Sequence, residues 1–274
     1  TGDKLQTASL ANPGAKLPKG LFTKELEVAL LEGEAGLAVH SLKDLPTELP
    51  DGLALGAVTE REDARDVVIA REPCRSVTDL PEGAVVASSS PRRMAQLRQL
   101  RPDTRGVEIR GNVGTRLRKI AEQTDLHATL LAMAGMKRLG YTVGTDGRLA
   151  GPDVPAGLFA LPLAPEEMIP AVGQAAIGLE IRADDPVMKE LCARLNHADT
   201  WHCVTAERAF LRAMGGGCLS PVAGHAVIRD GRLHLMAVSF QTGSCHTATG
   251  QGEPTKAAEV GRIVAAQIDA PKLA

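Results

Sequence analysis

A dense run of arginines lies between Ser90 and Lys119. This stretch holds eight arginines and one lysine against two acids, Asp103 and Glu108, whereas the whole chain has a formal net charge of -2. An arginine guanidinium offers a planar fork of donors that pairs with carboxylate or phosphate groups. The local excess of positive charge therefore predicts an anionic ligand that carries several negative groups.

Two of these arginines stand at a predicted helix start. The segment Ser88–Arg93 follows the apolar run 84–87, and its pattern indicates a strand, a turn and then a helix with Ser90 at the N-cap and Pro91 in the first position. Helix starts favour anions, whereas Arg92 and Arg93 at this position oppose the helix dipole. We interpret this arrangement as a site built to hold negative charge.

A second glycine-bearing turn, Arg110–Arg116, joins the next predicted strand to a helix that has Asn112 as its N-cap. Gly111 lets the backbone approach a ligand, and Arg110 and Arg116 could reach the same space as the first arginine pair. The alternative is a solvated basic face. We expect that simpler fate for the remaining cations of the run, Arg98, Arg101, Arg105, Arg118 and Lys119.

Cys218 follows three consecutive glycines, each of which costs about 1 kcal/mol relative to alanine in a helix. One interpretation is a loop that exposes a nucleophile or a covalent attachment point. The other is a helix C-cap loop with an incidental cysteine. We expect the other four cysteines to be small core residues: Cys74, Cys192, Cys203 and Cys245.

Asp44 follows Lys43 in a loop just beyond an apolar strand. A carboxylate at the carboxyl end of a strand can stabilise a developing cation or move a proton. An ordinary turn aspartate before Pro46 explains the same residue without chemistry. His40, in the strand itself, is expected to be a core histidine with a satisfied hydrogen bond.

Alternating strands and helices must position these residues. The chain shows predicted strands at 36–40, 53–58, 66–70, 84–87, 107–110, 128–133 and 175–181, and predicted helices at 24–34, 91–100, 113–122, 186–195, 203–214 and 255–268. This alternation indicates a parallel sheet with ligands at the carboxyl ends of its strands. The segment 141–165 is rich in glycine and proline and is expected to be a loop, and Asp230-Gly231 is expected to turn a hairpin.

Composition narrows the class of protein. The 274 residues suit two or three domains, and aromatics make up only 2%, so the cores must be aliphatic. No apolar run approaches the roughly 20 residues of a membrane span, and no signal peptide is apparent. Five scattered cysteines argue against a disulfide framework and against a zinc site, so we expect a reducing intracellular setting and no metal.

At this point the motifs resemble a known family. The segments Lys19–Glu27, Ala38–Pro46, Arg110–Arg116, Pro170–Gln174 and Gly216–Cys218 are similar to those of the porphobilinogen deaminase family, also called hydroxymethylbilane synthases, in the same order. The resemblance implies a cytoplasmic transferase of tetrapyrrole, porphyrin and heme biosynthesis, or one of the plastid stroma if the source is a plant. Such enzymes join four porphobilinogen molecules head to tail with release of ammonia, and they use a covalent dipyrromethane cofactor.

The resemblance also assigns roles to residues. It implies that Cys218 holds the cofactor by a thioether and that Asp44 is catalytic. The implied cofactor contacts are Lys43, Asp44, Ser89, Ser90, Arg92, Arg93, Arg110, Gly111 and Arg116. The implied substrate contacts are Lys19, Phe22, Arg110, Arg116 and Gln174. Each pyrrole unit of the bound chain carries two carboxylates, which agrees with an arginine-rich site.

The family's fold sets the expected architecture, two α/β domains like those of periplasmic binding proteins and a small C-terminal α/β domain. We expect domain 1 at 1–62 and 172–196, domain 2 at 63–171, and domain 3, with the cysteine, at 197–274. Family members begin with a strand and helix that carry a Thr-Arg-x-Ser motif, whereas Thr1–Lys4 aligns after that unit. We therefore expect the first βα unit of domain 1 to be absent from this sequence, as in a fragment of a longer chain.

Two other functions are compatible with parts of the sequence. A non-enzymatic two-domain protein that binds a polycarboxylate explains the arginines but gives Cys218 no role. A nucleic-acid binder explains the basic run, yet the chain has only four Phe, one Tyr and one Trp as stacking platforms. We therefore expect a monomeric enzyme whose partner is the small molecule porphobilinogen, with no nucleic acid and no membrane.

Overall fold

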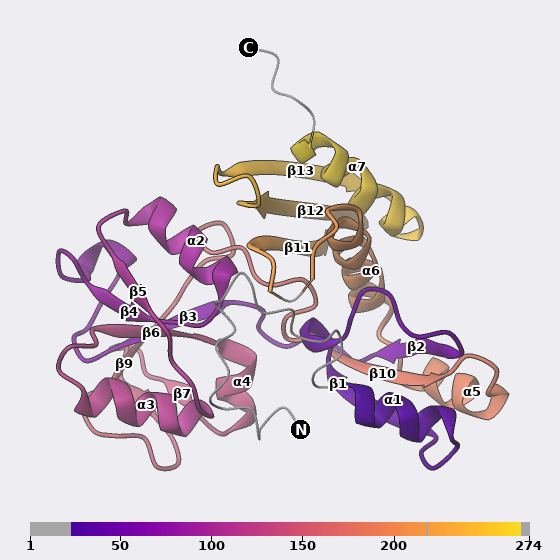
Figure 1. Ribbon diagram of the computed structural model, residues 1–274, viewed down its shortest axis with the longest axis horizontal. Helices are drawn as coiled ribbons and strands as arrows, with labels where there is room; N and C mark the ends of the chain where they lie inside the picture. Colours follow the sequence, from indigo (N-terminus) through magenta and orange to yellow (C-terminus); the bar gives the residue numbers. More distant parts are fainter. Residues whose placement is uncertain (1–22, 218, 270–274) are drawn as a thin grey trace. The chain divides into compact units, whose positions relative to one another are not determined.

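The computed structural model describes residues 23–217 and 219–269, which form a mixed α/β protein (Figure 1). Within the described chain, residues 23–62 and 169–269 form one compact unit and residues 63–168 form another. Three predicted site residues, Lys19, Phe22 and Cys218, lie outside the described residues. The finer division into three domains stays a prediction.

The unit 63–168 is built on a five-stranded sheet with the order β5-β4-β6-β3-β9. Its strands are β3 (Asp66–Ala70), β4 (Val85–Ala87), β5 (Arg105–Val107), β6 (Ala128–Ala132) and β9 (Phe159–Pro162). Strand β4 pairs in parallel with β5 and β6, whereas β3 pairs antiparallel with β6 and β9. The predicted parallel sheet is therefore correct for three strands and wrong for the other two.

Apolar residues on both faces of this sheet explain how its helices attach. Alternate residues of β3 point to opposite faces, so Val67 and Ile69 join one core and Val68 and Ala70 join the other. Helices α3 (Val113–Glu122) and α4 (Met133–Arg138) contribute to the first core, and helix α2 (Pro91–Leu100) contributes to the second. Helices α2 and α3 match their predicted ranges, and α4 was not predicted.

The segment 141–165 is not the loop that we predicted. It contains the two-stranded pair β7 (Thr142–Val143) and β8 (Leu149–Ala150), and it also contains β9. Strand β9 lies at the edge of the larger sheet, where Pro162 is tolerated because one side of an edge strand needs no ladder bonds. The predicted strand 107–110 is also misplaced, because β5 pairs with β4 over residues 105–107.

The other unit contains two three-stranded sheets. The first has the order β1-β10-β2, with β1 (Leu37–Ser41), β10 (Ile177–Arg182) and β2 (Leu53–Val58) all paired antiparallel. Helices α1 (Lys24–Leu31) and α5 (Pro186–Leu195) belong to this part. Helix α1 ends three residues before the predicted limit, and Leu26 is exposed because the buried stripe runs through Thr23, Glu27 and Leu30.

The second sheet of this unit is the antiparallel set β11 (Val222–Arg229), β12 (Arg232–Ser239) and β13 (His246–Gly252). Helices α6 (Ala198–Ala213) and α7 (Ala257–Asp269) share one core with it, with Phe210 fully buried. The predicted hairpin turn at Asp230-Gly231 is confirmed, whereas β13 was not predicted. Helix α6 begins five residues before its predicted start, with His197 as the N-cap.

Candidate active site

Two helix starts of the unit 63–168 have the predicted caps. Ser90 accepts a hydrogen bond from the Arg93 amide at 3.4 Å, and Asn112 Oδ1 accepts one from the Thr115 amide at 2.9 Å. The strands that precede them, β5 and β4, are parallel neighbours, so the loops after them lie at the same edge of the sheet. Ser89 joins the two loops, because its hydroxyl donates to the Ile109 carbonyl at 2.9 Å.

Arg92 and Arg93 share a buried counter-ion, Asp66, which the sequence did not reveal. Arg92 Nη1 lies 2.6 Å from Asp66 Oδ2, and Arg93 Nη2 lies 2.7 Å from Asp66 Oδ1. Arg93 Nη1 also donates to the Leu130 carbonyl at 2.9 Å. Burial alone raises the pKa of Asp66, but the two guanidiniums outweigh it and hold the pKa well below its usual range. This aspartate therefore stays ionised and keeps both arginines at the sheet edge.

Arg116 has a different environment from this pair. Its Nε donates to the Gly111 carbonyl at 2.9 Å, and among the described residues it has no carboxylate partner. Burial lowers the pKa of Arg116, and the positive charges of Arg93 and Arg110 lower it further. Arg110 Nη2 lies 3.6 Å from Glu108 Oε1, and Lys119 Nζ donates to the Arg110 carbonyl at 3.1 Å. The four predicted arginines are thus near one another. An anionic ligand would supply the carboxylate partner that Arg116 lacks among the described residues.

If the reaction expected from the sequence takes place here, replacing Arg116 with glutamine should lower its kcat/KM about tenfold to hundredfold, because one charged hydrogen-bond donor to an anion contributes about 1.5–3 kcal/mol. The matched control is Arg118→Gln, since Arg118 lies on the same helix α3 and is exposed. Steady-state kinetics of both variants tests the expectation. Equal kinetics in the two variants would place Arg116 outside the binding site.

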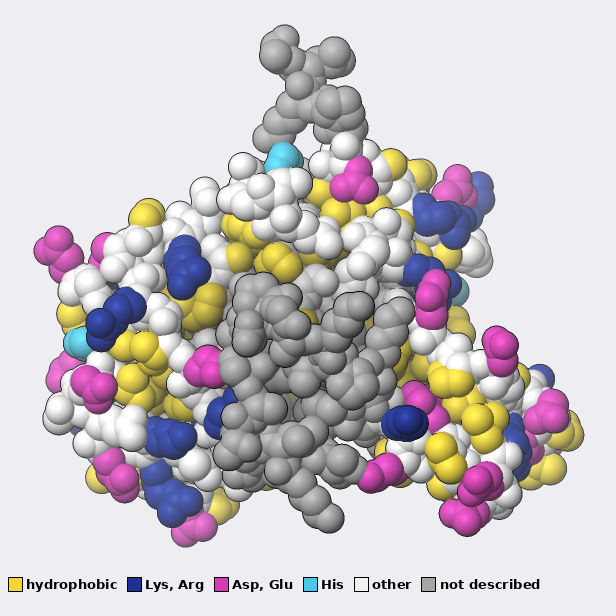
Figure 2. Space-filling view, in the orientation of Figure 1, with side chains coloured by type: hydrophobic (Ala, Val, Ile, Leu, Met, Phe, Trp, Pro, Cys, Tyr) yellow, Lys and Arg dark blue, Asp and Glu magenta, His cyan; other side chains and the backbone are white. Residues whose placement is uncertain are grey.

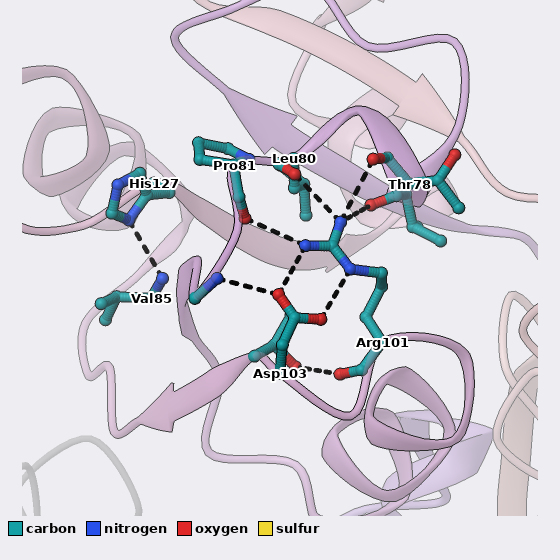
Figure 3. A network of polar contacts seen from close by, with 10 residues as sticks. Thr78, Leu80, Pro81, Val85, Arg101, Asp103 and His127 are labelled. Atoms are coloured by element: carbon teal, nitrogen blue, oxygen red, sulfur yellow. Dashed lines mark hydrogen bonds and ion pairs between the residues drawn. The ribbon is translucent and has the colours of Figure 1, made fainter.

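Arg101 does not belong to the solvated basic face on which we placed it. Its guanidinium pairs with Asp103 at 2.7 Å and donates to the carbonyls of Val77, Leu80 and Pro81 at 2.9–3.0 Å (Figure 3). Asp103 in turn accepts the Gly83 amide at 2.8 Å. These bonds hold the segment that includes the short helix η3 (Val77–Asp79), so Arg101 stabilises the fold and is no candidate ligand.

The other unit carries Lys43 and Asp44 in a single-turn helix, η2 (Leu42–Asp44), directly after β1. Asp44 is exposed and Lys43 is half-buried, whereas Leu42 and Leu45 on either side of the pair are 1% and 4% exposed. The predicted core histidine is confirmed, because buried His40 lies 2.8 Å from Glu180 Oε2 on β10. The sequence thus places an exposed carboxylate between two apolar anchors.

Two glycines make room for the first anchor. Gly173 adopts a φ of +72°, and a Cβ built there would lie 3.1 Å from Leu42 Cγ, while a Cβ on Gly178 would lie 2.8 Å from Leu42 Cδ1. This gives the Pro170–Gln174 motif a packing role. Gln174 itself is 1% exposed, and its carbonyl accepts Arg61 Nε at 2.8 Å.

Glu207 of α6 is a fully buried carboxylate that sequence reasoning missed. It accepts hydrogen bonds from Arg61 Nη1 at 2.5 Å and from the amides of Gly173 and Ala226 at 2.7 Å each. Burial alone raises the pKa of Glu207, but the Arg61 guanidinium and His225 outweigh it and lower the pKa to about 2. The sequence contains no clear signal of this role, because Glu207 stands next to Arg208 in a helix that carries several other polar residues.

Substituting Glu207 with glutamine is expected to lower the free energy of unfolding at pH 7 by about 3–5 kcal/mol, because the change leaves the Arg61 charge buried without its partner. The folded pKa lies below the ordinary value of 4.5, so this stabilisation is present above pH 4.5 and is lost as pH falls toward 2. Urea unfolding should show that the difference in free energy of unfolding between wild type and Glu207→Gln is smaller at pH 3 than at pH 7. Glu190→Gln, at an exposed pair on α5, is the control, and a gap independent of pH would contradict this account.

The glycines before Cys218 have a capping role. Helix α6 ends at Ala213, Gly215 has a φ of +62°, and the amides of Gly215 and Gly216 donate to the carbonyls of Arg212 and Leu211 at 3.0 and 3.1 Å. This pair of bonds is a Schellman motif, which explains Gly215 as a helix terminator. The Gly217 amide donates to the Ser220 hydroxyl at 2.9 Å. Capping therefore accounts for Gly215, as the helix C-cap interpretation expects, whereas Cys218 itself lies outside the described residues.

Three of the other cysteines are poor nucleophiles. Burial raises the pKa of the Cys203 thiol to about 12 and also raises the pKa of Cys192 and Cys74. The prediction of core cysteines is confirmed for Cys192 and Cys203, whereas Cys74 and Cys245 are only partly buried. Among the described residues, no group of three His, Cys, Asp or Glu side chains is arranged to hold a metal ion.

Two models of known protein families match most of the chain. Residues 1–190 match the family described as "Porphobilinogen deaminase, dipyromethane cofactor binding domain", and residues 201–270 match "Porphobilinogen deaminase, C-terminal domain". Among solved structures, a periplasmic binding protein from Salmonella typhimurium is 14% identical and covers 62% of this chain and 69% of its own, with a TM-score of 0.35. That likeness is too low to support an argument about fold or function.

Curated relatives are much closer. The porphobilinogen deaminase of Pelobacter propionicus is 48% identical over 237 residues, which is 86% of this chain and 70% of the relative. Those of Syntrophomonas wolfei and Syntrophobacter fumaroxidans are each 43% identical, over 97% and 98% of this chain and 81% of each relative. The two family matches fall in both described units and also include residues 1–22, 218 and 270. This chain belongs to the porphobilinogen deaminase family.

Proposed function

We propose that this protein is a hydroxymethylbilane synthase, a transferase that joins four porphobilinogen molecules head to tail and releases ammonia at each step. The product is linear hydroxymethylbilane. The observation that carries this function is the family match, which covers residues 1–190 and 201–270. The same match gives the enzyme a dipyrromethane cofactor.

The residues of the unit 63–168 fit such a cofactor. Four arginines gather at one sheet edge against two acids, Asp66 and Glu108, and Arg116 has no carboxylate partner among the described residues. A ligand that carries several carboxylates supplies the missing negative charge. When bound, the dipyrromethane provides a covalent primer with a free pyrrole position at which a carbon–carbon bond can form.

The proposed cofactor attachment is a thioether at Cys218, which lies outside the described residues. The proposed noncovalent cofactor contacts are Lys43, Asp44, Ser89, Ser90, Arg92, Arg93, Arg110, Gly111 and Arg116. The proposed substrate contacts are Lys19, Phe22, Arg110 and Arg116. Gln174, which the resemblance also implied, is 1% exposed and is therefore not proposed as a direct contact. Arg110 and Arg116 are expected to bind carboxylates directly, whereas Asp66 holds Arg92 and Arg93 in place while they contribute charge.

Asp44 is the proposed catalytic residue. In each step a carbon–nitrogen bond of the substrate breaks and ammonia leaves, which makes the substrate pyrrole cationic. A carbon–carbon bond then forms, and the attacked pyrrole position loses a proton. The ionised carboxylate of Asp44 accepts hydrogen bonds from pyrrole N–H groups and stabilises the developing positive charge. The Asp44 side chain is exposed at the end of strand β1.

We further propose a monomeric cytoplasmic enzyme that binds neither nucleic acid nor membrane. On the face seen in Figure 2, Lys and Arg side chains are interspersed with Asp and Glu over the described surface, which disfavours binding to a polyanion. Along the described part of the chain, every helix is too short or too polar to cross a bilayer.

Incubation of the purified protein with porphobilinogen tests the function. We expect ammonia to be released with the consumption of porphobilinogen, and a linear tetrapyrrole to be detected by mass spectrometry. A non-enzymatic binding protein for polycarboxylates would bind porphobilinogen without releasing ammonia.

A further inference from the structure

Helix α6 holds the loop that carries Asp44. The loop comprises residues 41–47, and we call it the Asp44 loop. Arg208 Nη1 donates to the Leu45 carbonyl at 3.1 Å, and Arg208 Nη2 donates to the Pro46 carbonyl at 2.7 Å. One helical turn later, Arg212 donates to the Thr47 carbonyl. Three successive carbonyls after Asp44 are therefore bound by arginines of one helix.

Burial makes the Arg208 contact unusual. Arg208 is 9% exposed, although an arginine is seldom buried unless its charge is balanced. Burial and, to a smaller extent, the charge of Arg212 lower the pKa of Arg208, and Glu180 opposes the shift. The resulting pKa is about 10, so Arg208 remains charged at neutral pH. Burial of the Arg208 charge is unfavourable in itself, and the buried guanidinium is found where it binds two carbonyls of the loop.

The opposite end of the loop is also fixed. The Leu42 amide donates to the Ala176 carbonyl at 2.9 Å, and the Leu42 side chain packs against Gly173 and Gly178. Asp44 therefore lies between a packed anchor at Leu42 and a hydrogen-bonded anchor at Leu45 and Pro46. Pro46 has no amide hydrogen, so it cannot fix the loop by donating a backbone hydrogen bond of its own.

We propose that Arg208 is a positioning residue, which fixes the Asp44 carboxylate for the reaction by holding the Leu45 and Pro46 carbonyls. The proposal rests on the catalytic role of Asp44 given under the proposed function. Cys218, the proposed attachment residue, follows the end of helix α6 by five residues. The helix whose arginines bind the Asp44 loop is therefore also the helix that precedes Cys218 in the chain. A guanidinium fork can bind two adjacent carbonyls at once, which a lysine ammonium on a flexible stem does less well.

Arg208→Met and Arg208→Lys test the proposal in the full chain. We expect Arg208→Met to lower kcat about tenfold to hundredfold with little change in KM, because small misplacements of a reacting group have effects of this size. Arg208→Lys should recover part of the loss. Intact mass should show that both variants carry the cofactor, and Arg194→Gln, at an exposed position on α5, should behave as wild type.

Hydrogen exchange and a double-mutant cycle separate positioning from general stability. Peptides covering 41–50 should exchange faster in Arg208→Met, whereas peptides from the unit 63–168 should not. Arg208→Met should cost much less activity in an Asp44→Glu background than in wild type, because Asp44→Glu already misplaces the carboxylate. Equal losses in both backgrounds, or unchanged exchange of the loop, would overturn the proposal. Normal turnover in Asp44→Asn would instead overturn the role of Asp44, so the two failures are distinguishable.

Discussion

Replacing Asp44 with asparagine is expected to give a folded protein that carries its cofactor and has lost most of its turnover. Asparagine has nearly the same shape but no negative charge, so it cannot stabilise the cationic pyrrole formed when ammonia leaves. Removal of one group that stabilises transition-state charge typically costs about 10²–10³ in kcat. We expect a loss of that order in the initial rate of ammonia release.

The structure explains why the fold should survive this change. The Asp44 side chain is exposed, and the loop is anchored by Leu42, by Leu45 and by Arg208. Surface substitutions usually change stability by less than about 0.5 kcal/mol, so thermal unfolding should match wild type. Asp51→Asn, at an exposed position of the same unit, is the matched control. Normal turnover in Asp44→Asn would remove this residue from the mechanism.

Local signals in the sequence predicted the parts of the site that depend on neighbouring residues. The N-caps at Ser90 and Asn112 and the full ranges of α2 and α3 are confirmed, because capping bonds join residues three positions apart. The strands β2 and β3 also match their predicted ranges, since a short apolar run bounded by polar residues is a local pattern.

Features that depend on distant residues were missed. Strand β9 exists because it pairs with β3, which is about ninety residues earlier, and its glycine-rich and proline-rich surroundings indicated a loop. Asp66 binds two arginines that are 26 and 27 positions away, so its role as their counter-ion required the fold. The sequence predicted Arg101 to lie on a solvated face, because most of its hydrogen-bond acceptors are backbone carbonyls, which no sequence pattern identifies.

The same limitation applies to the support of Asp44. The sequence identified the aspartate, whereas the residues that hold its loop lie more than 160 positions later, at Arg208 and Arg212. An arginine inside a helix ordinarily indicates a solvated face. Arg208 is instead buried, with its guanidinium against the carbonyls of Leu45 and Pro46, and only the structure could show this.

Replacing Cys218 with serine is expected to abolish cofactor attachment and therefore turnover, while the protein still folds. A serine hydroxyl is a much weaker nucleophile than a thiolate and cannot form a thioether. Intact mass under denaturing conditions should show wild type heavier by two linked pyrrole units and Cys218→Ser unmodified, with peptide mapping to place the addition. Circular dichroism and thermal unfolding should show that the variant keeps its secondary structure.

Cys245→Ser is the matched control, because Cys245 lies in the same C-terminal segment and is only partly buried. Of the remaining cysteines, Cys74, Cys192 and Cys203 have thiols whose pKa is raised by burial, so few of them are ionised near neutral pH. The added mass should therefore persist in Cys245→Ser. Retention of the added mass in Cys218→Ser would move the attachment to another cysteine. Since Cys218 follows the capped end of α6, that result would also separate the attachment site from the helix that holds the Asp44 loop.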